Sequence, residues 1–337
     1  MAKPPISAQS AASAQDRSRL PLHPMKQPAA WLKAFWKFSR PHTIIGTSFS
    51  TAALLAIALA AALPNAVAIT AVQILGIWLT AWIACLCGNV YIVGLNQIED
   101  IAIDRINKPH LPIASGEFSK RHAQQLVWLM GIGAIALAAL SQNIGLILTI
   151  GLSLIIGTAY SLPPIRLKRH PFWASMCILA VRGAIVNLGL YLYFATELEL
   201  GAAVPARVWA LTIFVLVFSF AIAIFKDIPD LEGDRRFNIS TYTLQLGQKR
   251  VFNLARWVLT ACYGGLIVAA PFLSGVNTLF LIATQSISIF SFWWLSRRVD
   301  LDPAPIKKDI SYPEFYQFIW KLFFVEYLIF PLACWLS

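Results

Sequence analysis

Two acidic windows decide how this chain is interpreted: Asn96-Gln-Ile-Glu-Asp-Ile-Ala-Ile-Asp104 and Lys226-Asp-Ile-Pro-Asp-Leu-Glu-Gly-Asp234. Together they hold seven of the 16 carboxylates, and each follows a long apolar run. Carboxylates are costly beside a membrane unless cations neutralise them. Asn96, Asp100 and Asp104 recur every fourth residue, so on a helix they share one face. Two such windows facing each other would hold divalent cations through oxygen ligands and leave room for a phosphorylated substrate.

The composition outside the windows predicts an all-α polytopic membrane protein. The chain has 337 residues, of which 58% are hydrophobic and 13% charged, with a mean hydropathy of +0.66. Soluble domains carry about 25% charged residues. Apolar runs of about 20 residues are long enough to cross a bilayer as helices. Nine such spans are predicted, near residues 43–63, 71–95, 122–140, 143–161, 172–195, 207–225, 251–273, 277–296 and 314–336.

The N-terminal segment differs from the rest of the chain. Residues 1–30 are rich in Ala, Ser, Pro and Gln without periodicity, which predicts a disordered tail. Residues 31–337 then form one transmembrane domain. The tail has no apolar core typical of secretory signals, although a short transit peptide remains an alternative. All five cysteines lie within apolar runs, which favours buried thiols over disulfides.

Basic residues concentrate on alternate loops of the predicted helix order. They precede the first span and follow the second, fourth, sixth and eighth, whereas the opposite loops carry only Arg207. By the positive-inside rule, this pattern predicts a cytoplasmic N-terminus and places both acidic windows on the cytoplasmic side. The net charge of +11 is consistent with this topology and with an anionic ligand at the same face, and no nucleic-acid partner is predicted.

Several cations lie close to the acidic windows in the sequence. Tyr160-Ser-Leu-Pro-Pro-Ile-Arg166-Leu-Lys168-Arg169 follows the fourth span, and its proline pair ends the helix. Alone, this stretch is a basic flank of a membrane span, but beside two acidic windows it is a candidate diphosphate clamp. Further candidates are Arg105, Lys108 and Lys226, and Lys226 has the alternative of pairing with a carboxylate of its own window.

Three polar residues inside or beside the spans are candidate ligand contacts. Arg182 lies deep in the fifth span, where a charge indicates a functional site by default. Asn187 follows five residues later, and a structural hydrogen-bond network between helices is the alternative for both. Arg40 opens the first span and could reach either the site or lipid headgroups. Lys321 and Glu326 in the ninth span are expected to be structural.

The windows and their surroundings resemble the UbiA superfamily of intramembrane prenyltransferases. The resemblance runs from about Arg40 to Trp335. Asn107-Lys-Pro-His-Leu-Pro-Ile-Ala-Ser-Gly116 and Leu246-Gly-Gln-Lys-Arg-Val-Phe252 resemble the homogentisate prenyltransferase branch. The short tail looks cyanobacterial rather than plant-like. The resemblance implies nine helices around a central cavity, a lateral opening for an isoprenoid tail, and a thylakoid or plasma membrane location.

The resemblance also assigns residue roles and a reaction. Two Mg²⁺ ions with the diphosphate would be held by Asn96, Asp100 and Asp104 on one side and Asp227, Asp230 and Asp234 on the other. Tyr160, Lys168 and Arg169 would hold the diphosphate, and Arg166 stands where relatives often have lysine. The branch implies transfer of a phytyl group from phytyl diphosphate to homogentisate with decarboxylation, giving 2-methyl-6-phytylbenzoquinol, a tocopherol precursor. Independently of the resemblance, the carboxylate of the acceptor needs a cationic or hydrogen-bonding anchor, and Arg182 and Arg40 are the candidates for it.

Alternative functions remain at this stage. Within the superfamily they are a chlorophyll synthase, a homogentisate solanesyltransferase or a 4-hydroxybenzoate enzyme. Asn107-Lys-Pro argues against the first, because chlorophyll synthases resemble Asn-Glu-Pro at that place. An organic-anion transporter is the alternative from another class, but transporters bind substrate near the bilayer midplane, whereas these acids lie at one face.

Overall fold

The computed structural model describes residues 21–62, 69–237, 240–299 and 310–337. Within these ranges, nine helical spans are long and apolar enough to cross a membrane, which confirms the sequence prediction. Seven are single helices: α3 (Pro41–Ala62), α4 (Ala71–Glu99), α6 (Lys120–Leu140), α7 (Ile144–Ser161), α10 (Ala206–Asp227), α14 (Thr278–Ser296) and α15 (Tyr312–Trp335). The fifth span joins α8 (Pro171–Ile178), the π-helical η3 (Leu179–Ile185) and α9 (Val186–Glu197), and the seventh joins α13 (Gln248–Ala269) and the 3₁₀ turn η4 (Ala270–Phe272).

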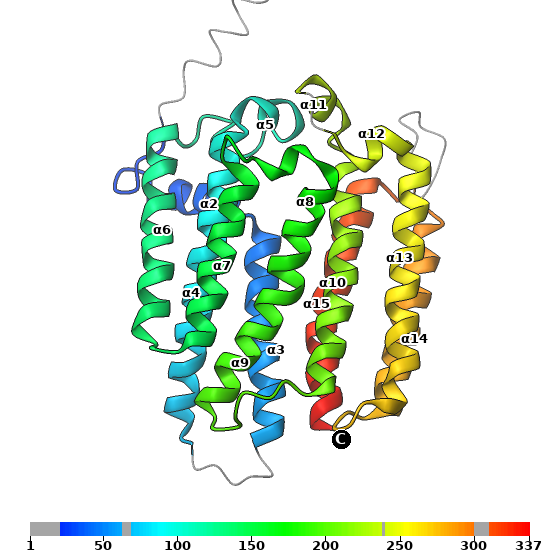
Figure 1. The fold of residues 1–337 in the computed structure, drawn as a ribbon. Helices are drawn as coiled ribbons and strands as arrows, with labels where there is room; N and C mark the ends of the chain where they lie inside the picture. The colour runs from blue at the N-terminus through cyan, green and yellow to red at the C-terminus, as the bar shows by residue number, and fades with distance from the viewer. Residues whose placement is uncertain (1–20, 63–68, 238–239, 300–309) are drawn as a thin grey trace, which may run out of the picture.

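The spans form a bundle whose short helices gather at one end (Figure 1). These are α2 (Pro28–Phe38), α5 (Ile101–Asn107), α11 (Leu231–Arg236) and α12 (Tyr242–Leu246). Because α5 and α11 carry parts of the two acidic windows, the bundle brings both windows to the same end. The orientation of that end in a membrane stays a prediction.

Helix boundaries follow local polar signals in the sequence. Helix α4 begins after Thr70 and α15 begins after Ser311. Each of these residues forms reciprocal hydrogen bonds with the residue three positions later, which is Gln73 in α4 and Glu314 in α15. The Asn143 side chain accepts a hydrogen bond from the Gly145 amide, which starts α7 directly after the turn from α6. These caps satisfy backbone groups that the first helical turn leaves unpaired.

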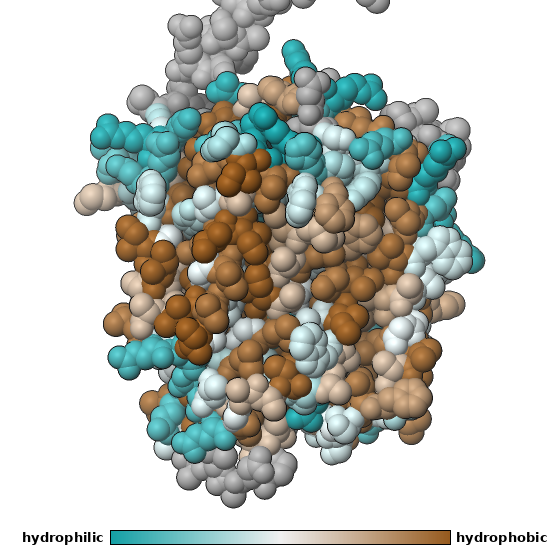
Figure 2. Space-filling model, viewed as in Figure 1, coloured by the Kyte–Doolittle hydropathy of each residue, from teal (hydrophilic) through white to brown (hydrophobic). Residues whose placement is uncertain are grey.

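The outer surface of the bundle is apolar over its middle. Figure 2 shows hydrophobic residues around the centre of the visible face and hydrophilic residues gathered toward its two ends. Large side chains such as Trp128, Ile132 and Phe290 are more than 60% exposed. An exposed apolar belt of this kind fits contact with lipid tails. In the central helix α10, by contrast, 67% of the apolar membrane-spanning stretch is buried within the protein.

The predicted disordered tail falls mainly on residues 1–20, which lie outside the described ranges, so it stays a prediction. Residues 21–27 form an irregular segment that leads into α2. The backbone amide of Leu22 donates to the Glu117 carbonyl oxygen at 3.0 Å, and Lys37 on α2 pairs with the Glu117 carboxylate at 2.8 Å. The chain just before the first span is therefore fixed against the loop that precedes α6.

A glycine on α4 sets how closely α2, α4 and α6 pack. A Cβ at Gly94 would lie 2.6 Å from both Phe38 Cζ and Val127 Cγ2. We expect Gly94→Ala to lower the free energy of unfolding by about 1–3 kcal/mol, since close-packed side chains must move. Thermal unfolding of the purified protein in detergent measures this effect.

Gly76→Ala on the same helix is the matched control, because nothing lies within 4 Å of its added Cβ. We expect it to leave the unfolding midpoint unchanged or to raise it slightly, since alanine favours helix. Equal midpoints for the two variants would contradict the packing argument.

Candidate active site

The two acidic windows meet at the end of the bundle. The helix carrying the first window is interrupted at Asp100, so Asp104 lies on the separate helix α5 and not on a continuous α4. Helix α5 packs against α11. Lys108, just after α5, forms an ion pair with Asp230, and the Asn107 side-chain amide donates to the Asp230 carbonyl oxygen at 3.1 Å. The segment that follows one window therefore binds the other.

Cations from the predicted clamp neutralise the first window. Arg166 Nη2 lies 3.0 Å from Asp100 Oδ1, and Lys168 Nζ lies 2.6 Å from Asp100 Oδ2. The Lys168 side chain is only 6% exposed. Burial lowers the pKa of Lys168, and the Asp100 carboxylate opposes that shift. Asn96 completes the cluster by donating to Asp100 at 3.1 Å.

The second window also has two cationic partners, which are Lys108 on Asp230 and Lys226 on Asp227. Lys226 Nζ lies 3.5 Å from Asp227 Oδ1 and also donates to the Tyr160 hydroxyl at 3.5 Å. Asp104 and Asp234 are not in an ion pair with any described residue. Burial raises the pKa of Asp104 to about 6 and that of Asp234 to about 7, and the nearby Asp230 carboxylate adds to both rises. Asp104 Oδ2 is buried without a hydrogen-bond partner among the described residues.

A cavity of about 800 Å³ opens beneath the windows, between α3, α4, α7, η3, α10 and α15. Its polar end is lined by Asn96, Lys108, Lys226 and Asp230. Along α7 the lining runs from Tyr160 back to Thr149, eleven residues or about 16 Å of helix. The cavity therefore joins a charged mouth to a long, largely apolar interior.

Helix α15 lines the cavity with an aromatic stripe. Its members recur at helical spacing and are Tyr312, Tyr316, Trp320, Phe323 and Tyr327. The Tyr312 hydroxyl donates to the Phe225 carbonyl oxygen at 2.5 Å, which fixes the start of α15 beside the second window. The stripe presents ring faces and edges to whatever occupies the cavity.

Arg182 reaches the cavity from the π-helical segment of the fifth span. Its guanidinium carbon lies 4.8 Å from the Trp320 ring centre and 5.7 Å from that of Phe323. Asn187 donates to the backbone carbonyl oxygens of Arg182 and Gly183 at 2.9 and 2.8 Å, and its own oxygen accepts from Tyr327. These bonds fit the structural alternative for Asn187, which does not line the cavity, whereas Arg182 does.

Apart from Asn187, the predicted site residues divide into three groups by position. Those that line the cavity are Asn96, Tyr160, Lys108, Lys226, Asp230, Arg182 and Arg40. Those within or beside the window clusters but behind the lining are Asp100, Asp104, Asp227, Asp234, Arg166 and Lys168. Arg105 and Arg169 are exposed and do not line the cavity.

Several lining residues are not predicted from the sequence. His42 lies against Trp320 with ring centres 4.7 Å apart and ring planes inclined by 52°, and Asn89 and Gln317 also line the cavity. The spacing of the α15 aromatics was a readable signal, whereas nothing in the sequence marks Asn89 or Gln317. Glu326, which was expected to be structural, accepts a hydrogen bond from Gln285 at 2.9 Å.

The windows suit a hard divalent cation by their chemistry. Carboxylate and amide oxygens are the ligands that Mg²⁺ prefers, and the unpaired Asp104 Oδ2 is a free acceptor. In the described part of the chain, however, no three His, Cys, Asp or Glu side chains converge closely enough to form a preassembled metal site. Lysine and arginine side chains hold the Asp100 and Asp230 oxygens that a metal would take.

The comparisons agree with this architecture. The chain belongs to the UbiA prenyltransferase family, whose sequence profile matches residues 42–322. It is 50% identical over 312 residues to the homogentisate phytyltransferase of Synechocystis sp., covering 91% of this chain and 97% of that protein. It is 39% identical over 308 residues to the chloroplastic homogentisate solanesyltransferase of Arabidopsis thaliana, covering 90% and 77% respectively.

Solved structures show the same fold. A UbiA homologue from Archaeoglobus fulgidus bound to GPP and Mg²⁺ matches with a TM-score of 0.61 at 18% identity, over 90% of this chain and 100% of that one. A structure of digeranylgeranylglyceryl phosphate synthase matches with a TM-score of 0.60 at 17% identity, over 91% and 99%. The expected nine-helix UbiA-like architecture is thereby confirmed.

Asp100 balances two cations, so its charge should matter for stability. We expect Asp100→Asn to lower the free energy of unfolding by about 3 kcal/mol, because buried Lys168 and neighbouring Arg166 lose their shared anion. Thermal unfolding in detergent measures the change.

Glu117→Gln is the comparison variant, since Glu117 pairs with a single, partly exposed lysine. We expect its cost to stay below about 1 kcal/mol. If Asp100→Asn were no more destabilising than Glu117→Gln, the charge-balance interpretation would be wrong.

Proposed function

We propose that this protein transfers a phytyl group from phytyl diphosphate to homogentisate, with decarboxylation, giving 2-methyl-6-phytylbenzoquinol. The observation that carries the proposal is the meeting of two acidic windows and four cations at the mouth of a long apolar cavity. The relative that is 50% identical over nearly the whole chain, a homogentisate phytyltransferase, supports the choice of both substrates.

Two Mg²⁺ ions, bound together with the diphosphate, fit the two windows. Asn96, Asp100 and Asp104 would hold one, and Asp227, Asp230 and Asp234 the other. Bound Mg²⁺ neutralises charge that develops on a departing diphosphate.

The cations of the site can pair either with the carboxylates of the windows or with the oxygens of a diphosphate. Arg166 and Lys168 now contact Asp100, and Lys108 contacts Asp230. With a metal bound at the carboxylate oxygens, Arg166, Lys168 and Lys108 would be free to bind diphosphate oxygens, and arginine can do so in a bidentate manner. Lys226 and Tyr160 line the same mouth and would orient the diphosphate toward the windows. The exposed Arg105 and Arg169 would add long-range attraction for an anionic substrate.

The cavity interior suits an allylic cation and an aromatic acceptor. Ring faces of the α15 stripe stabilise positive charge, and the apolar lining limits access of water to it. Arg182, with Arg40 as the alternative, would bind the carboxylate of homogentisate. During the reaction the C–O bond of the donor breaks and a ring C–C bond forms. The ring loses a proton at the new bond. The carboxylate on the side chain of homogentisate leaves as CO₂, and a proton takes its place.

The proposed setting follows from topology. The basic loops and the site share one end of the bundle, which we place on the cytoplasmic side of a thylakoid or plasma membrane. Membrane lipid surrounds the apolar belt, and the prenyl donor enters the cavity sideways from the bilayer.

A substrate matrix tests the proposal directly. Membranes containing the protein are incubated with geranylgeranyl, phytyl and solanesyl diphosphates, each paired with homogentisate and 4-hydroxybenzoate. The proposal expects phytyl diphosphate with homogentisate to give the highest rate. A preference for solanesyl diphosphate would favour the solanesyltransferase alternative, and accumulation of an organic anion without covalent product would favour transport.

The metal proposal has a pH-dependent consequence. With pKa values of about 6 and about 7, Asp104 and Asp234 bind protons as pH falls below those values, so a metal must displace these protons. We expect EDTA to abolish activity. The Mg²⁺ concentration for half-maximal rate should rise about tenfold per pH unit between pH 7 and pH 6, where Asp234 binds a proton, and Asp104 adds a second proton only below pH 6. Product formation measured from pH 8 to pH 6 across a Mg²⁺ series shows this.

Variants isolate the two carboxylates. We expect Asp104→Asn and Asp234→Asn each to lower kcat on the order of a hundredfold, while the folded protein persists because neither residue is in an ion pair with a described residue. Glu117→Gln, which removes a carboxylate outside the windows, should retain activity. Full activity of both window variants, or activity without divalent cations, would reject the metal assignment.

Arg182 offers a separate test of acceptor binding. We expect Arg182→Ala to raise the KM for homogentisate about tenfold or more, because a buried charged hydrogen bond is lost, and to change the KM for phytyl diphosphate little. Steady-state rates with each substrate varied in turn measure both constants. Arg207→Ala, at the other end of the bundle, is the control, and an equal effect of Arg182→Ala on both substrates would remove its acceptor role.

A further inference from the structure

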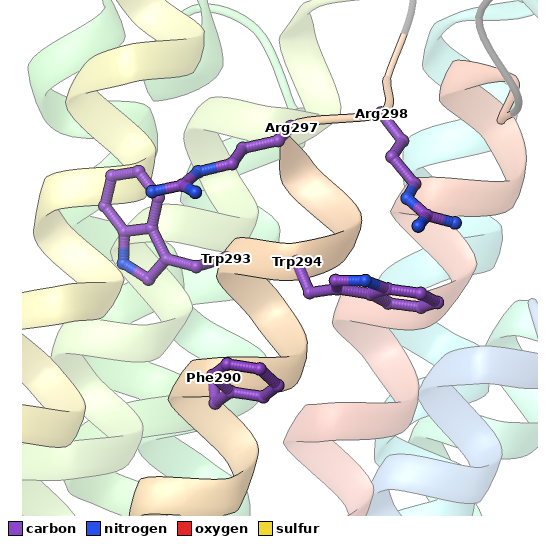
Figure 3. Close-up of a pocket in the computed structure, with 5 residues that line it drawn as sticks. All are labelled: Phe290, Trp293, Trp294, Arg297 and Arg298. Atoms are coloured by element: carbon purple, nitrogen blue, oxygen red, sulfur yellow. The ribbon is translucent and has the colours of Figure 1, made fainter.

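A second hollow lies on the outer face of α14, away from the cavity. It has a volume of about 270 Å³ and is lined by Phe290, Trp293, Trp294, Arg297 and Arg298. Figure 3 shows Arg297 extending over Trp293 on one side and Arg298 lying above Trp294 on the other, with Phe290 one turn below. The arginines follow the end of α14 on the side of the bundle that carries the acidic windows (Figure 1). We refer to these five residues as the α14 hollow.

Cations in and beside the α14 hollow rest on indole rings. The Arg298 guanidinium carbon lies 4.0 Å from the Trp294 ring centre, and that of Arg297 lies 5.7 Å from the Trp293 ring centre. Arg256 on the neighbouring helix α13 approaches the same Trp293 ring at 4.1 Å. Two guanidinium groups therefore share one indole, and their mutual repulsion favours an anion bound beside them.

The guanidinium groups retain capacity for such an anion. Over the described ranges, none of the three arginines pairs with a carboxylate within ion-pair distance. Arg256 Nε is also buried without a hydrogen-bond partner among those residues. Stacking on indole leaves the N–H edge of a guanidinium available for a phosphate, which it can bind through two parallel hydrogen bonds.

The apolar part of the α14 hollow indicates an amphipathic ligand. Phe290 is 72% exposed, and Ile287, three residues earlier on the same helix, is 64% exposed. Both belong to the apolar belt below the arginines, where an acyl chain would lie. A free phosphate ion would leave this surface uncovered, whereas a lipid would cover it and place its headgroup at the arginines.

We propose that the α14 hollow binds the headgroup of an anionic glycerophospholipid from the leaflet next to the acidic windows. The phosphodiester lies between Arg297 and Arg298, with Arg256 adding charge from α13, and the acyl chain follows Phe290. Basic pockets between membrane helices at this depth are suited to lipid headgroups. The bound lipid would fix the α13–α14 hairpin at the surface of that leaflet.

Lipid retention tests the proposal. The full chain is reconstituted in vesicles of equal parts phosphatidylglycerol and phosphatidylcholine and extracted in mild detergent, and the retained lipids are quantified by mass spectrometry. We expect the wild type to retain phosphatidylglycerol preferentially, and R297Q/R298Q to lower that preference about tenfold. The control K33Q/K120Q removes the same charge from the same end of the bundle and should stay within about twofold of the wild type.

Additional arms separate the possible causes. F290Q keeps both cations and changes an exposed position, so it should fold and still lower retention severalfold. R297K/R298K keeps the charge but loses bidentate bonding, and it should also bind less lipid. Retention equal to the wild type in both variants, or an equal loss in K33Q/K120Q and R297Q/R298Q, would reduce the effect to diffuse charge and overturn the proposal. Displacement of the lipid by soluble glycerol 3-phosphate would show a free-phosphate site and overturn it as well.

Discussion

Neutralisation of carboxylates at the end of the bundle is the constraint on which the site depends. Asp100 is held by Arg166 and Lys168 from the segment after α7, and Asp230 by Lys108 from the segment after α5. At an effective dielectric constant near 20, a pair of charges 4 Å apart interacts by about 4 kcal/mol. Pairs of this strength position three separate segments, yet each can exchange one partner for another of like charge. A site built in this way is ordered without ligand, and under the proposed function it would still accept metal and diphosphate.

The apolar cavity complements this charged mouth. The α15 stripe and the α7 lining occupy the interior of the bundle, and the start of α15 is bonded to the carbonyl of Phe225 immediately before the second window. The place where a diphosphate would separate from its prenyl group is thereby next to aromatic rings rather than to bulk water. This proximity matters because electrostatic stabilisation is strongest where water is excluded.

The parts of this arrangement that sequence could predict are those set by length and by ligand chemistry. Nine apolar runs correspond to nine spans within the described part of the chain, and the clustering of oxygen ligands pointed to both windows. Other features depend on packing between distant segments. The helical repeat of 3.6 residues in the sequence does not predict three such features. They are the interruption of the helix at Asp100, the π-helical turn at Arg182 and the hydrogen bonds of Asn187 inside the bundle. Likewise, Arg105 and Arg169 have the charge expected of a clamp, but their exposure depends on how helix α5 and the 3₁₀ turn Leu167–Arg169 are oriented.

The contact between α5 and α11 has a thermodynamic consequence for the whole molecule. Spans one and two precede the first window, and spans three to six lie between the first window and the second, so a ligand that bridges the windows also crosslinks these two parts of the chain. Because such a ligand binds the folded state and not the unfolded chain, tighter binding raises the free energy of unfolding. An unliganded preparation in detergent would then understate the robustness of the protein in a membrane supplied with substrate, and prenyl diphosphates would serve as stabilising additives during purification.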